Sequence, residues 1–404
     1  MGKTTLPRPW PAGIIVLAAL ALLLGSCSED PTEENSLVAD LPLGEVIVRD
    51  TTILATSGSS YKQLIPMNGT ANLVGASGGY AAYLALQLFP SFFPVRDTIL
   101  VERATLELTA VGAAWDGSGT VAFGVHRIQR SWSQSRLTWD SVQTGFYEAD
   151  IVRGSYSAPA INDTQKVFID LDTAMVREWF LTPITDDTRK FGIILVPSPE
   201  ASAVQAFGTF ESFTDSLLPT LVVSASNVAG TVRDTSRYDL GADTFVGNID
   251  DLASDPSRLV VQAGVVYRST LQFDLAFLPE GTTINSATMS LELIPSASLF
   301  SRTTRDTVVA PHLRFGPDRE SSIEQERPSS FGRRKEGTAA TFTFAIPEAA
   351  QSWAKGPNYG LLLRATLFET GAESGSADRY VFHSVAAADS AVRPRLHIVY
   401  SSSR

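Results

Sequence analysis

Four side chains between residues 130 and 139 have the types and the spacing to bind a sugar. Arg130, Trp132, Arg136 and Trp139 alternate cation and indole along this stretch. Sugar rings stack on an exposed aromatic face, and a guanidinium group pairs with a carboxylate through two parallel hydrogen bonds. The pattern predicts a surface that binds an acidic polysaccharide. Trp115, which precedes a loop-forming Asp-Gly-Ser-Gly stretch, is predicted to be exposed and to contribute a further indole.

Packing in the core is the alternative role for the tryptophans of the first half. Trp139, and likewise Trp179, could close the ends of a β-sandwich as core residues. The second half of the chain has a single tryptophan, Trp353, and no counterpart of the 130–139 stretch. Binding is therefore predicted for the first half alone.

Signatures of catalysis are scarce. The sequence has no His-Glu-x-x-His, no Cys-x-x-Cys and no phosphate-binding Gly-x-x-x-x-Gly-Lys. His126 and His312 fall in matching predicted strands, which is typical of a scaffold position. Acidic residues crowd the stretch 239–255 without the spacing of an EF-hand, which leaves calcium open but assigns no metal ligand. We therefore predict a non-catalytic protein with no catalytic residue and no cofactor.

Composition sets further bounds. The chain has 404 residues, of which 44% are hydrophobic, and a formal net charge of −11. This size is sufficient for two buried cores. The negative charge disfavours nucleic acid as a partner, because nucleic-acid binding needs a basic surface. Cys27 is the only cysteine, so no disulfide can form within the chain.

The N-terminus carries the marks of export. Residues 1–27 contain two basic residues, then an apolar run too short to span a bilayer, then Leu-Gly-Ser-Cys. This ending resembles the lipobox of bacterial lipoproteins, which implies that Cys27 is lipidated and becomes the new N-terminus. Residues 28–44 are polar and are predicted to be a flexible tether that lifts the first domain off the lipid. By the same resemblance, Ser28 after the cysteine favours the outer membrane of a Gram-negative bacterium.

The rest of the chain predicts an all-β fold. Within 268–293, apolar residues alternate with polar ones in two runs, and a Pro-Glu-Gly turn separates the runs. A weaker copy of this pattern lies at 83–108. Short alternating runs with turn signals between them are typical of antiparallel β-sandwiches or jelly rolls. Two stretches differ, 172–181 and 347–355, and are predicted to be short helices.

The same pieces recur in the same order in the two halves. Trp179 matches Trp353 in the predicted helices, 192–196 matches 360–364, and 218–224 matches 393–400. We therefore predict two tandem sandwiches, at 45–226 and 235–404, with a linker at 227–234.

These pieces, together with the Trp-Ser-x-Ser-x-Leu-Thr-Trp-Asp segment at 132–140, resemble the DNRLRE-domain family. The resemblance implies a β-sandwich similar to carbohydrate-binding modules, on secreted or surface proteins, and in some members binding of acidic polysaccharide. Two functions stay open on the sequence. One is a lipid-anchored module that binds polysaccharide. The other is a structural or protein-interaction lipoprotein that binds no glycan.

Overall fold

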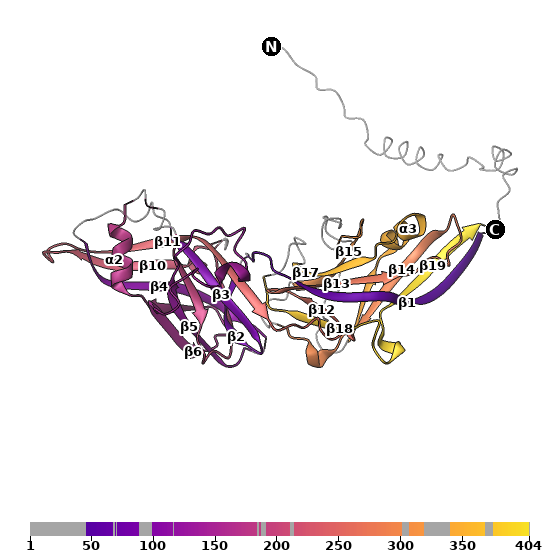
Figure 1. The fold of residues 1–404 in the computed structure, drawn as a ribbon, viewed down its shortest axis with the longest axis horizontal. Coiled ribbons are helices and arrows are strands. Elements are labelled where there is room, and N and C mark those ends of the chain that lie inside the picture. Colours follow the sequence, from indigo (N-terminus) through magenta and orange to yellow (C-terminus); the bar gives the residue numbers. More distant parts are fainter. Residues whose placement is uncertain are drawn as a thin grey trace, which may run out of the picture. The chain divides into compact units, whose positions relative to one another are not determined.

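The computed structural model describes residues 46–67, 69, 71–88, 99–115, 117–183, 186, 191–210, 214–300, 307–318, 340–367 and 375–403. Within these residues the protein is all-β, with two curled antiparallel sheets and two short α-helices (Figure 1). Each sheet encloses a hydrophobic core of its own, which confirms the predicted pair of β-sandwiches. Both lie within Val48–Ser401, which forms one compact unit.

No helix in these described segments has the length and apolar character to cross a membrane.

The first sheet, called sandwich one, has the strand order β11-β10-β4-β9-β2-β3-β8-β5-β6, and β7 pairs with β4. Its core is made by inward-facing residues such as Leu106, Phe123 and Ile193. Its strands are β2 (Ala71–Ser77), β3 (Tyr80–Leu88), β4 (Ile99–Ala113), β5 (Thr120–Arg127), β6 (Gly154–Pro159), β7 (Gln165–Asp170), β8 (Ile193–Pro197), β9 (Val204–Gly208), β10 (Thr220–Asn227) and β11 (Arg233–Ile249).

The second sheet, called sandwich two, has the order β15-β17-β13-β1-β19-β14-β16, and β12 pairs with β13 and β18. Its core includes Leu271, Met289 and Phe344. Its strands are β1 (Val46–Gln63), β12 (Arg258–Gln262), β13 (Val266–Phe273), β14 (Thr283–Glu292), β15 (Thr307–Leu313), β16 (Thr341–Ala345), β17 (Leu361–Leu367), β18 (Arg379–His383) and β19 (Arg395–Ser403).

The predicted phase of the strands in 268–293 is confirmed. Leu271, Phe273 and Leu275 are buried, as are Met289, Leu291 and Leu293. The two strands are nevertheless not a hairpin, because β1 and β19 lie between β13 and β14 in the sheet. Alternation fixes which face of a strand is buried, but it does not name the neighbour.

Both predicted helices are present. Helix α2 (Thr173–Leu181) starts after Asp172, whose Oδ1 accepts a hydrogen bond from the Ala174 amide at 2.8 Å. Its apolar face, including Trp179 and Phe180, is buried in the core of sandwich one. Helix α3 (Pro347–Lys355) buries Trp353 in sandwich two.

The first strand of the chain lies in the second sandwich. Ala55–Gln63 of β1 pair antiparallel with Phe273–Val266 of β13. On the other side of β1 lies β19, and the Ala55 amide donates to the Pro394 carbonyl at 2.9 Å. Residues 46–63, placed by the sequence repeat in the first copy, therefore complete the second sheet.

The reverse holds for β11. Its first part, Arg233–Asp239, pairs with β10, and its second part, Leu240–Ile249, pairs with β3. Residues 233–249, placed by the repeat at the linker and in the second copy, thus complete the first sheet. Sandwich one is the continuous stretch 71–249, and sandwich two is built from 46–63 and residues after 257. The physical reason is that each of these long strands pairs with two strands of the sandwich it completes.

Candidate functional site

One outer face of sandwich one carries apolar and aromatic side chains. Alternation along β3, β5, β8 and β11 sends Leu84 and Leu195 inward and leaves Tyr83, Ile194 and Val246 on the opposite face. Val246 in β11 lies directly opposite Tyr83 in β3. A sheet face of this kind needs a cover, and the chain supplies one between β5 and β6.

The cover contains the predicted tryptophan segment. Its apolar side chains Leu137, Val142 and Phe146 are buried against the sheet face, and they hold the segment in place. Residues 139–142 form a short 3₁₀ helix, which begins after Thr138. The segment is therefore a turn followed by a helical turn, and Thr138 and Trp139 do not lie in a strand. We call Tyr83, Trp132, Trp139, Tyr147 and Phe191 on this face the aromatic cluster; all five are half-buried.

The two tryptophans of the cluster are held by specific contacts. The indole of Trp139 packs on the ring of Tyr83, with 4.8 Å between ring centroids and 55° between ring planes. Trp132 donates from Nε1 to the Phe191 carbonyl at 2.8 Å. Each indole is fixed on one side and keeps part of its surface accessible. Both rings therefore pack on their neighbours and remain partly exposed.

Three members of the cluster, Tyr83, Tyr147 and Phe191, were not found from the sequence. Tyr147 packs on His126, with 5.2 Å between ring centroids. Burial raises the pKa of both Tyr83 and Tyr147, and the proximity of Tyr83 raises that of Tyr147 further. These hydroxyls stay neutral at physiological pH and can donate a hydrogen bond. The sequence did contain one signal for Tyr83. It alternates with the core residue Leu84 in β3, so its side chain had to point to the face opposite the core.

The two arginines of the segment lie on its solvent side. Arg130 and Arg136 are both exposed. The Arg136 amide closes a turn onto the Ser133 carbonyl at 3.0 Å, which places this guanidinium on a turn between the two tryptophans. Arg130 and Arg136 thus share one short segment with Trp132 and Trp139.

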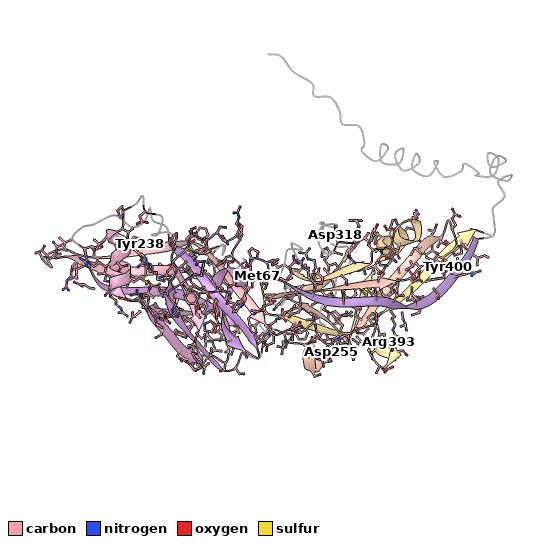
Figure 2. All side chains as sticks on the ribbon, in the orientation of Figure 1. Met67, Tyr238, Asp255, Asp318, Arg393 and Tyr400 are labelled. Atoms are coloured by element: carbon pink, nitrogen blue, oxygen red, sulfur yellow. The ribbon has the colours of Figure 1, made fainter. Side chains whose placement is uncertain are left out.

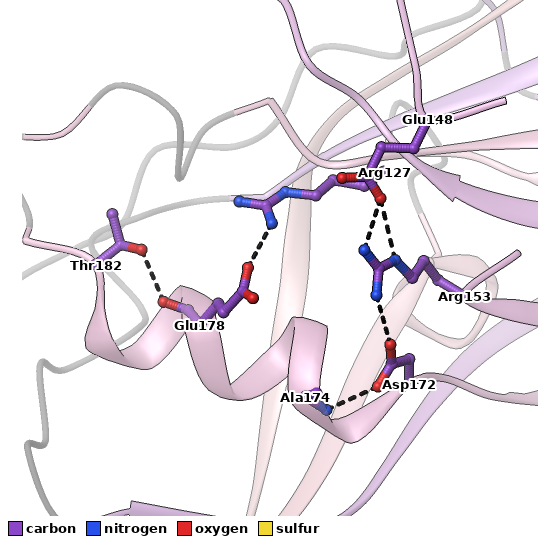
Figure 3. Close-up of polar contacts among 7 residues, drawn as sticks. All are labelled: Arg127, Glu148, Arg153, Asp172, Ala174, Glu178 and Thr182. Carbon is purple, nitrogen blue, oxygen red and sulfur yellow. Dashed lines mark hydrogen bonds and ion pairs between the residues drawn. The ribbon is translucent and has the colours of Figure 1, made fainter. Parts of the chain in front are cut away.

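An ion-pair network joins the end of the cover, at Glu148 and Arg153, to helix α2 (Figure 3). Arg153 donates from Nη2 to Glu148 Oε2 and from Nη1 to Asp172 Oδ2, each at 2.8 Å. Arg127 pairs with Glu178 on the helix. The carboxylates raise the pKa of Arg153, and Arg153 helps to hold that of Asp172 below its usual value although burial acts in the opposite direction. The network is structural, since each charge is matched by a neighbour.

Trp115 does not belong to the cluster, and its predicted exposure is wrong. Only 9% of the residue is accessible. Its ring meets Tyr80 edge-on, and its Nε1 donates to the Ala377 carbonyl at 2.9 Å. The loop that carries Trp115 is covered by the segment before β18, which the local sequence could not reveal.

Four of the acidic residues of 239–255, namely Asp239, Asp243, Asp251 and Asp255, accept hydrogen bonds within the protein. Asp243 is buried and accepts hydrogen bonds from Asn72 and from the Phe210 amide, at 2.9 and 2.7 Å. Asp255, labelled in Figure 2, accepts from Ser257 and pairs with Arg258. Among the residues that the structure describes, no group of three or more His, Cys, Asp or Glu side chains is arranged to hold a metal ion.

Two further features of the sequence have structural explanations. His126 and His312 are both buried, and His126 Nδ1 lies 2.8 Å from the Glu148 carbonyl. The stretch Gly75–Gly79, GASGG, has the Gly-x-Ser-x-Gly spacing of hydrolases, in which the serine lies between a strand and a helix. Here Ser77 ends β2, and the turn at 78–79 leads into strand β3 instead.

Cys27 and the tether 28–44 lie outside the described residues. No protein-family model matches the chain, and no curated protein is significantly similar to it.

Proposed function

We propose that the protein is a lipid-anchored envelope protein that binds polysaccharide through the aromatic cluster of sandwich one, without catalysing a reaction. The observation that carries this proposal is the pair of half-buried indoles, Trp132 and Trp139, fixed on a sheet face beside two exposed arginines. A preorganised aromatic surface binds with little loss of side-chain freedom, because its rings are already ordered by packing.

The chemistry of the surface favours an acidic sugar. Sugar C–H groups pack on the indole faces, and the Tyr83 and Tyr147 hydroxyls offer hydrogen bonds to sugar oxygens. Arg130 and Arg136 add charge-assisted hydrogen bonds to carboxylate groups. Screening by salt should weaken the arginine contribution, whereas the stacking contribution persists.

The experiment is a glycan array probed with the mature chain from residue 28, in parallel with an Arg130→Gln/Arg136→Gln variant. Both arginines are exposed, so this variant should fold as the parent does. The proposal expects the parent to bind acidic polysaccharides and the variant to bind them less tightly. Absence of any bound glycan on the array would count against polysaccharide binding.

The anchor is proposed from the sequence, at Cys27. Two or more acyl chains give stable membrane attachment, where a single chain gives only reversible binding. The chain and a Cys27→Ala variant are expressed in a Gram-negative host with labelled palmitate and then fractionated. The parent should carry label in the outer-membrane fraction, and the variant should carry none. A parent that is fully soluble and unlabelled would contradict the anchor.

The alternative function is a lipoprotein that binds a protein partner or has a structural role. It is favoured by Phe168 on β7, which is 59% exposed and lies opposite Glu107 of β4 on the outer face of the sheet. A single exposed aromatic is common on protein surfaces, and for this reason we rank this function second. Partner capture that is lost in Phe168→Ser and retained in the double arginine variant would favour it.

A further inference from the structure

Strand β1 belongs to sandwich two and strand β11 to sandwich one, an arrangement that we call the strand exchange. It determines which sandwich directly follows an anchor at Cys27. The tether leads directly into β1, and β1 is a central strand of sandwich two, between β13 and β19. Near the tether end of β1, His397 Nε2 of β19 lies 2.6 Å from Asp50 Oδ1. Since β1 and β19 run antiparallel, this end of sandwich two holds the first residues of β1 and the residues of β19 that follow His397 (Figure 1).

The opposite end of β1 meets sandwich one. Lys62 donates from Nζ to Asn248 Oδ1 at 2.9 Å and to the Ile249 carbonyl at 3.3 Å, both at the end of β11. At about 3.3 Å per residue, Asp50 and Lys62 are about 40 Å apart along the strand. The chain thus crosses sandwich two along its length before it reaches sandwich one.

We propose that sandwich two lies nearest the lipid surface and that sandwich one, with the aromatic cluster, is held beyond it. The end of sandwich two at Asp50 and His397 faces the membrane. This order reverses the order expected from the sequence, in which the first half would follow the tether. The inference rests on the proposed anchor at Cys27.

The length of the chain before β1 agrees with this order. Residues 28–45 span at most about 60 Å even when fully extended. The first residues of β1 therefore cannot be further than about 60 Å from the proposed anchor, whereas the strand itself carries the chain about 40 Å beyond that point. A cluster that binds polysaccharide gains reach from the membrane by this arrangement.

Energy transfer to a membrane dye tests the order without relying on natural lipidation. The chain from residue 28 carries an N-terminal hexahistidine and is bound to phosphatidylcholine vesicles that contain nickel-chelating lipid and an acceptor dye on a headgroup. Single reporter cysteines are placed at Ser286 and at Ala229, both exposed. Ser286 lies opposite Val399 in β19, and Ala229 lies in the turn between β10 and β11. Along β11, Arg233 is about 50 Å from Asn248, the residue that meets Lys62.

The proposal expects higher transfer from the donor on Ser286→Cys than from the donor on Ala229→Cys. As a control, an untagged chain is coupled to maleimide lipid through Ala229→Cys, with the donor on the N-terminal amine; transfer from that donor should then be low. Equal transfer from both reporters, or higher transfer from Ala229→Cys, in the N-terminally bound chain would overturn the proposed order. Because the anchor here is artificial, a failure of palmitate labelling would reject the natural anchor and leave this comparison intact.

Discussion

Lys62 of β1 and Asn248 of β11 are joined by a hydrogen bond of 2.9 Å between Nζ and Oδ1, where the two long strands of the molecule end. Each of these strands completes the sandwich that the sequence repeat assigns to the other half. They occupy equivalent places: Ala55 lies opposite Phe273, Leu240 lies opposite Leu88, and each ladder shifts register within the next two residues. The ladders indicate that β1 and β11 are counterparts in two related sandwiches.

The exchange predicts which fragments fold. Residues 64–249 contain every strand of sandwich one and should unfold cooperatively alone, whereas 45–226 lacks β11 and should not. The reason is that β11 pairs with both β10 and β3, so its loss exposes the backbone edges of two strands. Thermal unfolding followed by circular dichroism compares the two fragments. Cooperative unfolding of 45–226 with a melting temperature equal to that of 64–249 is the outcome that the exchange forbids.

Sandwich two should depend on β1 in the same way. The fragment 64–404 lacks this central strand, and its second sandwich should unfold at a lower temperature than in the full chain. A synthetic peptide of residues 46–63 should restore stability, because it supplies the missing ladder to β13. A scrambled peptide of the same composition is the control. If both peptides act equally, β1 is not recognised as a specific strand.

The core of sandwich two offers a test of strand phase. Leu271 on β13 is 1% exposed, and its replacement by Ala should cost about 2–5 kcal/mol in the free energy of unfolding, because burial is lost and a cavity remains. The matched control is Thr270→Ala, on the opposite face of the same strand. Denaturant unfolding gives both values. A loss below about 0.5 kcal/mol for Leu271→Ala would falsify the phase of this strand.

Acid should weaken sandwich one through Glu107. A hydrogen bond from Arg237 is the main cause that lowers the pKa of this carboxyl, with a second contribution from Lys166. A lowered folded-state pKa means that the stabilisation is complete above the unfolded value of about 4.3 and is lost as the pH falls through the folded value. Glu107→Gln should therefore lower the melting temperature at neutral pH and make it less dependent on pH below about 5. The measurement is the melting temperature of the fragment 64–249 as a function of pH. The same pH dependence in parent and variant would exclude this role for Glu107. The control is Asp163→Asn, which removes an exposed carboxyl group before β7.

The sequence predicted faces and elements better than partners. Period-two alternation identified Leu271 and Met289 as core, and Asp172 marked the start of α2. The sequence did not predict the strand exchange, because the same four residues occur near the starts of β1 and β11. Val-Arg-Asp-Thr occurs at 48–51 and again at 232–235. Two strands with the same pattern fit either sheet on local grounds, and the choice depends on contacts far apart in the chain.

The candidate site shows the same limit. The segment 130–139 was found by residue type, and it does lie on a sheet face with half-buried indoles. Tyr83 and Tyr147 join it from other parts of the chain, and Trp115 leaves it for a buried contact with Tyr80. Whether a tryptophan is covered depends on what folds over it, which spacing along the chain does not encode.

The measurement that tests the central claim most directly is affinity electrophoresis of the mature chain in gels containing an acidic polysaccharide. The parent should be retarded, less so at high salt, and Trp132→Ala should lose most of the retardation while its melting temperature stays close to that of the parent. Trp179→Phe, in the buried face of α2, is the matched control and should lower the melting temperature without changing retardation per folded molecule. Unfolding of Trp132→Ala would show that this indole is core, and a parent that migrates as freely as in a polysaccharide-free gel would contradict the account.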